Sequence, residues 1–320
     1  MAVWDGGPDL VGVVGRVLAT AQNGLEVLRF GGLETGTEPA PFAVVETHKM
    51  FRLRRYFPND PSTGPNIVLV PPMMVSANVY DVTEHNGAVS ILHRNGITPW
   101  VVDFGSPDSE EGGMERNLAD HVVAISHAID LIVEATGRDI HLAGYSQGGM
   151  FAYQTAAYRR SKGIASLITF GSPVDVLAAL PLGLPAGLVA PAAEFLADKA
   201  FSRNLWVRDW MARTGFQLLD PVKTVRSRID FLRRLHDRDA LLPREDQRRF
   251  LEADGWVAWS GPAIADSASG SGATGTMNFC HAVQSVAIAG TSRIAAKAIP
   301  TRARARTDQP SAAKIRKLTA

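Results

Sequence analysis

The stretch DIHLAGYSQGGMF, Asp139 to Phe151, decides how the middle of this chain folds. A short apolar run enters a glycine-rich turn, and a segment with helical spacing follows from Gly149 to Arg160. This order predicts a β-strand, a tight turn and an α-helix, with Ser146 at the crest of the turn. Gly144 and Gly148 flank the serine because side chains at those positions would collide across so tight a turn.

The predicted turn suits a nucleophile. Ser146 would stand at the amino end of the helix with its hydroxyl exposed, and the backbone N–H of Gln147 would point toward a developing oxyanion. Gly-x-Ser-x-Gly between a strand and a helix is the nucleophile elbow of α/β-hydrolases. The alternative is an ordinary connection between a strand and a helix, in which Ser146 has no chemical role.

The composition is that of a globular protein without a strong charge. Of 320 residues, 46% are hydrophobic, and the formal net charge of +1 gives no electrostatic preference for nucleic acid. The single cysteine, Cys280, excludes an internal disulfide and fits a reducing compartment. No apolar run approaches the ~20 residues that a membrane-spanning helix needs. We therefore expect a cytoplasmic protein with no transmembrane segment and no nucleic-acid partner.

Apolar runs alternate with helical segments along the chain, which predicts a mostly parallel sheet with helices on both faces. The runs expected to form buried strands are residues 66–70, 99–103, 140–143 and 164–170, and the helices between them are expected near 81–93 and over 114–136. Two β-like segments, 42–47 and 50–57, precede them, and Arg52 and Arg54 are expected on a solvated face or edge. The sequence carries no nucleotide-binding or metal-binding motif, so no metal or other cofactor is expected.

A second oxyanion donor is expected in the loop that follows the strand 66–70. In an α/β-hydrolase this loop supplies a backbone N–H to the oxyanion. Pro71 and Pro72 have no N–H, so Met73 is the first residue that can donate. Alternatively, Met73 and Met74 fill a gap in the core, and both roles are compatible.

The chain divides into three segments by composition. Residues 1–41 form an N-terminal helical segment, in which a helix over 8–23 is expected to cover one side of the domain. Residues 42–265 are expected to form the α/β-hydrolase core that the elbow motif predicts, with a helical lid at about 174–255 that is rich in proline and then in charge. Residues 266–320 form a low-complexity basic tail, expected to be disordered.

Four segments carry a resemblance to a known family: VLVPPMM (68–74), GITPWVVDFGSPD (96–108), GRDIHLAGYSQGGMFAYQTAAYRR (137–160) and ITFGSPVDV (168–176). Residues from about 42 to 261 resemble the polyhydroxyalkanoate synthase-like α/β-hydrolases, and in particular the actinobacterial type associated with acyl-CoA and lipid metabolism. The resemblance implies an acyl-enzyme formed from an ester or thioester. It also implies a histidine after the last strand and an aspartate after the strand before it.

The sequence departs from this family in two ways. The polymer synthases have cysteine at the elbow, whereas Ser146 stands here. A serine ester favours hydrolysis or simple acyl transfer, since exchange between thioesters suits a thiolate. After about residue 265 neither the aspartate turn nor a Gly-His is found. His281 is the only histidine after residue 236, and Asp175 is the nearest alternative acid, although Asp175 could instead cap a lid helix.

Two hypotheses account for the basic tail. A genuine tail could contact a membrane or nucleic acid, whereas an out-of-frame translation of a GC-rich gene would give the same Ala, Gly, Ser and Arg bias. The abrupt change near residue 265 favours the second hypothesis. The sequence as written therefore predicts an elbow without a working triad, and weak esterase activity. The rival to an active enzyme is an impaired, truncated hydrolase fold that at most binds acyl ligands.

Overall fold

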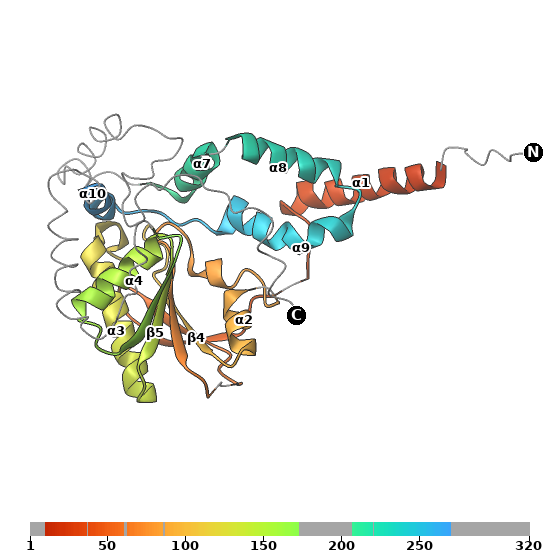
Figure 1. Cartoon of the computed structure of the whole chain (residues 1–320). Coiled ribbons are helices and arrows are strands. Elements are labelled where there is room, and N and C mark those ends of the chain that lie inside the picture. Colours follow the sequence, from red (N-terminus) through yellow and green to blue (C-terminus); the bar gives the residue numbers. More distant parts are fainter. Residues whose placement is uncertain are drawn as a thin grey trace, which may run out of the picture.

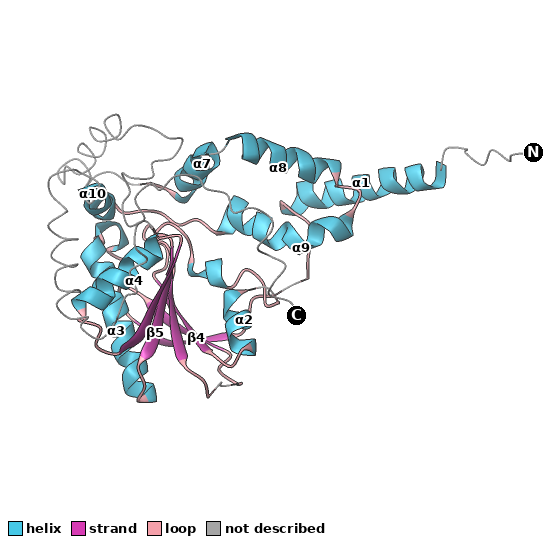
Figure 2. Cartoon of the chain, viewed as in Figure 1, coloured by secondary structure: helices cyan, strands magenta, loops and turns pink. Residues whose placement is uncertain are grey.

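The computed structural model describes residues 10–36, 38–60, 63–85, 87–172, 207–219 and 221–269. Within these residues six strands form one sheet, in the order β1-β2-β4-β3-β5-β6, and helices lie around it (Figure 2). The strands are β1 Phe42–Thr47, β2 Arg52–Tyr56, β3 Asn66–Val70, β4 Thr98–Asp103, β5 Ile140–Tyr145 and β6 Ile164–Phe170.

The sheet is parallel where the site lies and antiparallel at its other end. β3 pairs in parallel with β4 and β5, and β5 pairs in parallel with β6. β1 and β2, by contrast, are antiparallel to their neighbours. β3 and β4 are buried along their whole length, because helices cover both faces. The predicted mostly parallel sheet is confirmed.

The two faces of the sheet contribute to separate apolar clusters. On one face Val68 and Val70 pack with residues of α3, Leu118–Thr136, and α4, Gln147–Tyr158. On the other face Ile67 and Leu69 pack with the 3-10 helix η1, Ala77–Tyr80, and with α2, Ala88–Arg94. Alternate residues of a strand point to opposite faces, so a single apolar strand serves both clusters. Figure 1 shows α3 and α4 together on one side of the sheet and α2 on the other.

Two predicted helices have different boundaries in the structure. Of the segment expected as a helix near 81–93, only the second half is helical, in α2, and the 3-10 helix η1 ends just before the segment begins. The helix expected from residue 114 begins at Leu118, because Asn117 and Asp120 form a reciprocal capping box at its amino end. Gly137 ends this helix in the left-handed conformation, with φ 66°.

Helices follow in the described part of the predicted lid: α7 Asp209–Leu219, α8 Pro221–Arg233 and α9 Arg238–Arg249, with a π-helical turn at Phe250–Asp254. The first part of the lid lies outside the described residues. A further helix, α10 Gly261–Ser269, was not predicted. It crosses the expected boundary at residue 265, buries Ala263 to Ala265, and accepts a hydrogen bond from the N–H of Leu118 at Asp266. Residues 270–320, most of the predicted tail, lie outside the described part.

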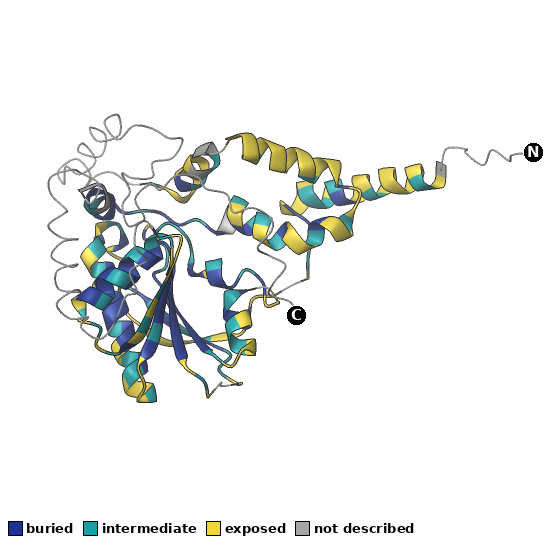
Figure 3. Ribbon diagram, viewed as in Figure 1, coloured by how far each residue is buried: buried dark blue, intermediate teal, exposed yellow. Residues whose placement is uncertain are grey.

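The N-terminal helix differs most from expectation. α1 runs from Leu10 to Phe30, through the Asn23-Gly24 pair. The prediction that it covers the domain with its apolar residues is wrong, since these side chains are exposed (Figure 3). The chain after α1 is instead held by α9. Glu245, which is 1% exposed, accepts a hydrogen bond from the N–H of Leu33 and pairs with Arg248.

A buried histidine joins the two helices that cover the site's side of the sheet. His121 of α3 donates from Nδ1 to the carbonyl of Asn117 at 2.7 Å, and its ring stacks on Phe151 of α4 with centroids 5.1 Å apart. Burial lowers the pKa of His121 from 6.5 to about 4. The imidazole is therefore neutral in the folded protein at neutral pH.

We predict that protonation of His121 destabilises the fold in mild acid. Because the unfolded state binds the proton more tightly, the free energy of unfolding should fall as pH drops from 6.5 toward about 4. The loss should reach about 2 kcal/mol by about pH 5. Urea unfolding against pH measures it. His121→Phe should reduce this dependence, whereas substitution of the exposed His236 by Gln should not; an equal reduction in both variants would contradict the assignment.

Candidate active site

Ser146 lies between β5 and α4, at the predicted crest. Its backbone has φ 52° and ψ −123°, which is outside the regions that non-glycine residues ordinarily occupy. Two hydrogen bonds fix this peptide: the N–H of Ser146 donates to Phe170 of β6 at 2.8 Å, and the N–H of Gly149 donates to the Ser146 carbonyl at 3.0 Å. A conformation of this kind costs ~1–3 kcal/mol, so the surrounding structure must impose it.

The flanking glycines are required by close contacts between backbones. A Cβ at Gly144 would lie 2.3 Å from the carbonyl oxygen of Gly148. A Cβ at Gly148 would lie 2.0 Å from the carbonyl oxygen of Val70, the last residue of β3. The first turn of α4 therefore rests directly on the end of β3. This contact sets the distance between Ser146 and the loop that β3 leads into.

We predict that Gly148→Ala destabilises the protein by about 3 kcal/mol, since the Val70 carbonyl is backbone and cannot move aside cheaply. The free energy of unfolding in urea measures the loss. Gly215→Ala, in the exposed part of α7 where a Cβ meets nothing within 4 Å, should be neutral or stabilise by up to about 1 kcal/mol. Equal effects of the two substitutions would show that the contact with β3 is unimportant.

A tyrosine hydroxyl ties the elbow to β3. Tyr80, buried in η1, donates to the carbonyl of Val70 at 2.6 Å and accepts from the N–H of Tyr145 at 3.1 Å. Tyr145 immediately precedes Ser146. The hydroxyl thus bridges the ends of two neighbouring parallel strands. The sequence did not point to Tyr80. Its two hydrogen-bond partners, Val70 and Tyr145, belong to other elements, so nothing in the local sequence pattern indicates the bridge.

We predict that Tyr80→Phe costs about 1–2 kcal/mol, because the ring remains packed while two backbone groups lose their partner. Thermal and urea unfolding measure the change. Tyr158→Phe, at an exposed position on α4, should have no measurable effect and controls for the substitution itself. A Tyr80→Phe protein as stable as the wild type would contradict the bridging role.

The loop after β3 is held from the other side by the chain that follows the lid. The N–H of Ser76 donates to Gly255 at 2.8 Å, and the N–H of Val257 donates to Met74 at 3.0 Å. The Met73 side chain is buried in the core cluster of β3, as the alternative role for this residue predicted. Among the described residues, no group accepts a hydrogen bond from the backbone N–H of Met73 or of Gln147. Both predicted oxyanion donors thus make no hydrogen bond to the described part of the chain.

Within the described residues, no side chain is hydrogen-bonded to the Ser146 hydroxyl. The candidate acid Asp175 and the candidate base His281 both lie outside the described part of the chain. One described histidine does contact a serine: His141 Nδ1 lies 2.7 Å from Ser166 Oγ, on paired positions of β5 and β6. This pair lies within two paired strands and not at a strained turn.

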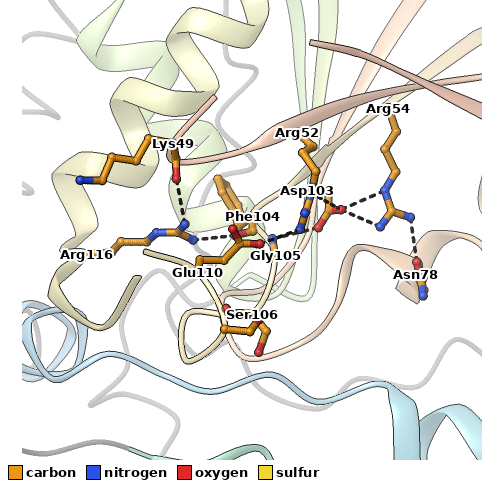
Figure 4. Close-up of polar contacts among 11 residues, drawn as sticks. Lys49, Arg52, Arg54, Asn78, Asp103, Phe104, Gly105, Ser106, Glu110 and Arg116 are labelled. Carbon is orange, nitrogen blue, oxygen red and sulfur yellow. Dashed lines mark hydrogen bonds and ion pairs between the residues drawn. The ribbon is translucent and has the colours of Figure 1, made fainter. Parts of the chain in front are cut away.

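A charged network holds the loop after β4 (Figure 4). Asp103, at the end of the strand, binds Arg54 at 2.6 Å and Arg52 at 3.4 Å, and Arg52 also binds Glu110 at 2.8 Å. Arg116 donates to the carbonyl of Phe104 at 2.6 Å. Of the expected solvated face or edge, the edge is wrong for these arginines, because β2 lies between β1 and β4, whereas the Arg52 side chain is 39% exposed. Both are paired with carboxylates, which anchors the loop and leaves little charge for a ligand.

In the described part of the chain, no group of three or more His, Cys, Asp or Glu side chains could hold a metal ion. None of the helices there combines the length and apolar content needed to cross a bilayer.

A family model for the alpha/beta hydrolase family matches residues 67–307, most of the chain. The chain belongs to the alpha/beta hydrolase family. Its sheet, mixed but mostly parallel, with helices on both faces and an elbow after β5, is the α/β-hydrolase fold that the sequence predicted. The match continues beyond residue 265.

One curated relative of this chain is Poly(3-hydroxyalkanoate) polymerase 2 of Ectopseudomonas oleovorans. It is 26% identical over 110 residues, which make up 34% of this chain and 19% of the polymerase. The chain therefore matches about a fifth of the length of that protein. The similarity to the polymer synthases that the sequence indicated is confirmed at this distance.

Several solved structures are similar to part of the chain. A Paleococcus ferrophilus monoacylglycerol lipase is 19% identical, with a TM-score of 0.39, over 64% of this chain and 65% of the lipase. The Francisella virulence factor BioJ is 14% identical, with a TM-score of 0.35, over 53% of this chain and 56% of BioJ. The mature Bacillus licheniformis lipase BlEst2 is 18% identical, with a TM-score of 0.31, over 40% of this chain and 49% of the lipase.

Proposed function

We propose that this protein is a serine hydrolase or acyltransferase that acts on acyl esters or thioesters through an acyl-enzyme. The observation that carries the proposal is the backbone of Ser146, which is forced into a strained conformation at the crest between β5 and α4. Strain at such a position is retained where the surrounding fold is built to present the side chain. Membership of the alpha/beta hydrolase family supports the same role.

The chemistry follows from the groups around this position. The Ser146 Oγ attacks the acyl carbonyl carbon, and its proton passes to a base. The N–H groups of Met73 and Gln147 stabilise the oxyanion that forms on the carbonyl oxygen. The C–O or C–S bond to the leaving group then breaks, and the base returns the proton to the alcohol or thiol. Water, or another acceptor, releases the acyl group from Ser146 by the reverse sequence of steps.

The proposed substrates are esters or thioesters of hydrophobic acids. The name of the polymerase relative indicates a polymer of hydroxyalkanoic acids joined by ester bonds. Because the chain is similar to this polymerase over 110 residues, we propose hydroxyacyl esters and thioesters as the first substrates to test. Serine in place of cysteine favours hydrolysis over polymerisation, because water readily clears an oxyester. We also propose a cytoplasmic location, on the evidence of the single cysteine.

The proposed base is His281 and the proposed acid is Asp175. Both lie within residues 67–307, which match the family model. No other histidine follows residue 236. A serine hydroxyl needs a base within roughly 2.6–3.2 Å to be an effective nucleophile, so this assignment decides whether the elbow is active. Translation of the gene in the other reading frames beyond codon 265 tests whether one of them encodes an aspartate turn and a Gly-His pair.

We predict that a fluorophosphonate probe labels the purified full-length chain at Ser146, and that Ser146→Ala abolishes both the labelling and the hydrolysis of a p-nitrophenyl acyl ester. Peptide mass spectrometry locates the label. Ser166→Ala is the matched control: it removes a serine that touches a histidine without occupying the elbow, and it should leave the labelling rate unchanged. If His281 is the base, His281→Ala should slow labelling by about 10³-fold or more.

The alternative is a hydrolase fold that binds acyl ligands without turning them over. It is favoured by the observation that no described side chain is hydrogen-bonded to the Ser146 hydroxyl. In that case the wild type and Ser146→Ala should label equally slowly, while an acyl ligand still raises the thermal unfolding midpoint. Rapid labelling that survives Ser146→Ala would contradict both candidates.

A further inference from the structure

Helix α1 turns its most apolar face away from the protein. Val11, Val14, Leu18, Ala21, Leu25 and Leu28 recur at alternating spacings of three and four residues, and we call this set the outer stripe. All six side chains are exposed, with Val11 at 85% and Leu28 at 88%. Figure 1 shows the first part of α1 extending beyond the neighbouring helices, and Figure 3 shows it coloured largely as exposed.

The orientation of α1 is fixed by polar contacts on its opposite face. Asn23, which is buried, donates from its side chain to the carbonyl of Leu235 at 2.7 Å. Arg238 binds Glu26 with two hydrogen bonds, at 2.5 and 3.0 Å, and donates to the carbonyl of Glu34 at 2.7 Å. The helix therefore contacts its own chain through Asn23, Glu26 and the partly buried Val27, and presents its leucine- and valine-rich face to the outside.

We propose that two copies of this chain associate through the outer stripes of their α1 helices. The spacing is that of positions a and d in a heptad repeat, over three successive a/d pairs, and this pattern is the signature of a helix that packs along another helix. The stripe consists of aliphatic residues alone, so it is complementary to a second copy of itself.

The exposed area is sufficient for a specific dimer. Burial of a large aliphatic side chain removes on the order of 100 Å² from water. The five large residues of the outer stripe, counted on both helices, thus contribute about 1,000 Å², which is near the lower limit for specific interfaces. Neighbouring apolar residues, among them Val17 at 63% exposure, add to this area.

The charge on α1 favours a second copy over a lipid surface. Helices that lie on anionic membranes carry several Lys and Arg beside their apolar stripe. α1 carries Arg16, Glu26 and Arg29, and Glu26 is already paired with Arg238. Two such helices can approach each other without strong charge repulsion, whereas α1 has too few basic residues to bind an anionic bilayer strongly.

The test compares adjacent valines of nearly equal exposure in the full-length protein. Val14 lies in the outer stripe and is 57% exposed, whereas Val13 lies outside it and is 53% exposed. Sedimentation equilibrium of the wild type should give twice the chain mass of 34.4 kDa. Val14→Glu should weaken self-association on the order of 100-fold, since a dimer loses the buried valine twice. Val13→Glu should leave the association unchanged.

Circular dichroism of both variants shows whether the helices are retained. A wild type that stays monomeric at all concentrations overturns the proposal, as does a dimer that Val14→Glu fails to weaken or that both substitutions weaken equally. Flotation with neutral and with anionic lipid vesicles tests the alternative, that the outer stripe binds a lipid surface. A monomer that floats with vesicles, and loses this property in Val14→Glu but not in Val13→Glu, would assign the outer stripe to lipid and refute pairing.

Discussion

The contact between the first turn of α4 and the end of β3 is the constraint on which the candidate site depends. The helix can approach this closely because Gly148 has no side chain between its backbone and the Val70 carbonyl. Tyr80 binds the same carbonyl and the residue before Ser146, so one backbone oxygen locates both halves of the site. Because the loop carrying Met73 starts directly after Val70, a displacement of α4 would change the distance between the nucleophile and both oxyanion donors.

The elbow could be predicted because all of its requirements are local in sequence. A strand, a glycine on each side of Ser146 and a helix follow one another within about twenty residues, and the strands 66–70 and 164–170 have the predicted boundaries. The expectation that 164–170 is buried is wrong: only Ile164 is buried, because β6 is the last strand of the described sheet and pairs there with β5 alone. Tyr80 and the hydrogen bonds from residues 255–257 could not be predicted in this way. They join segments distant in sequence, and a tyrosine that bridges two strands has the same local pattern as one that merely fills a core.

Periodicity also fails to say what an apolar face packs against. The spacing in α1 correctly indicates a helix with one apolar face, yet Asn23 and Glu26 turn that face outward by binding Leu235 and Arg238. Likewise, the arginines of β2 predicted a solvated face or a sheet edge, because charged residues are common at both. The carboxylate of Asp103 on the neighbouring strand compensates them instead, so β2 can lie inside the sheet. In both α1 and β2, the residue that binds a side chain decides whether it is exposed, and this residue is not indicated by the local sequence pattern.

The conformation of Ser146 separates an elbow built for chemistry from an ordinary turn. Four non-glycine residues in the described part of the chain have positive φ. With ψ −123°, Ser146 lies outside the left-handed helical region as well, where a side chain is most strongly disfavoured. Glycine would relieve this strain, yet the chain keeps a hydroxyl there and holds the peptide with bonds to Phe170 and Gly149. A fold with no use for that hydroxyl gains nothing from the cost, which is why the strained serine supports a catalytic role more strongly than the motif alone.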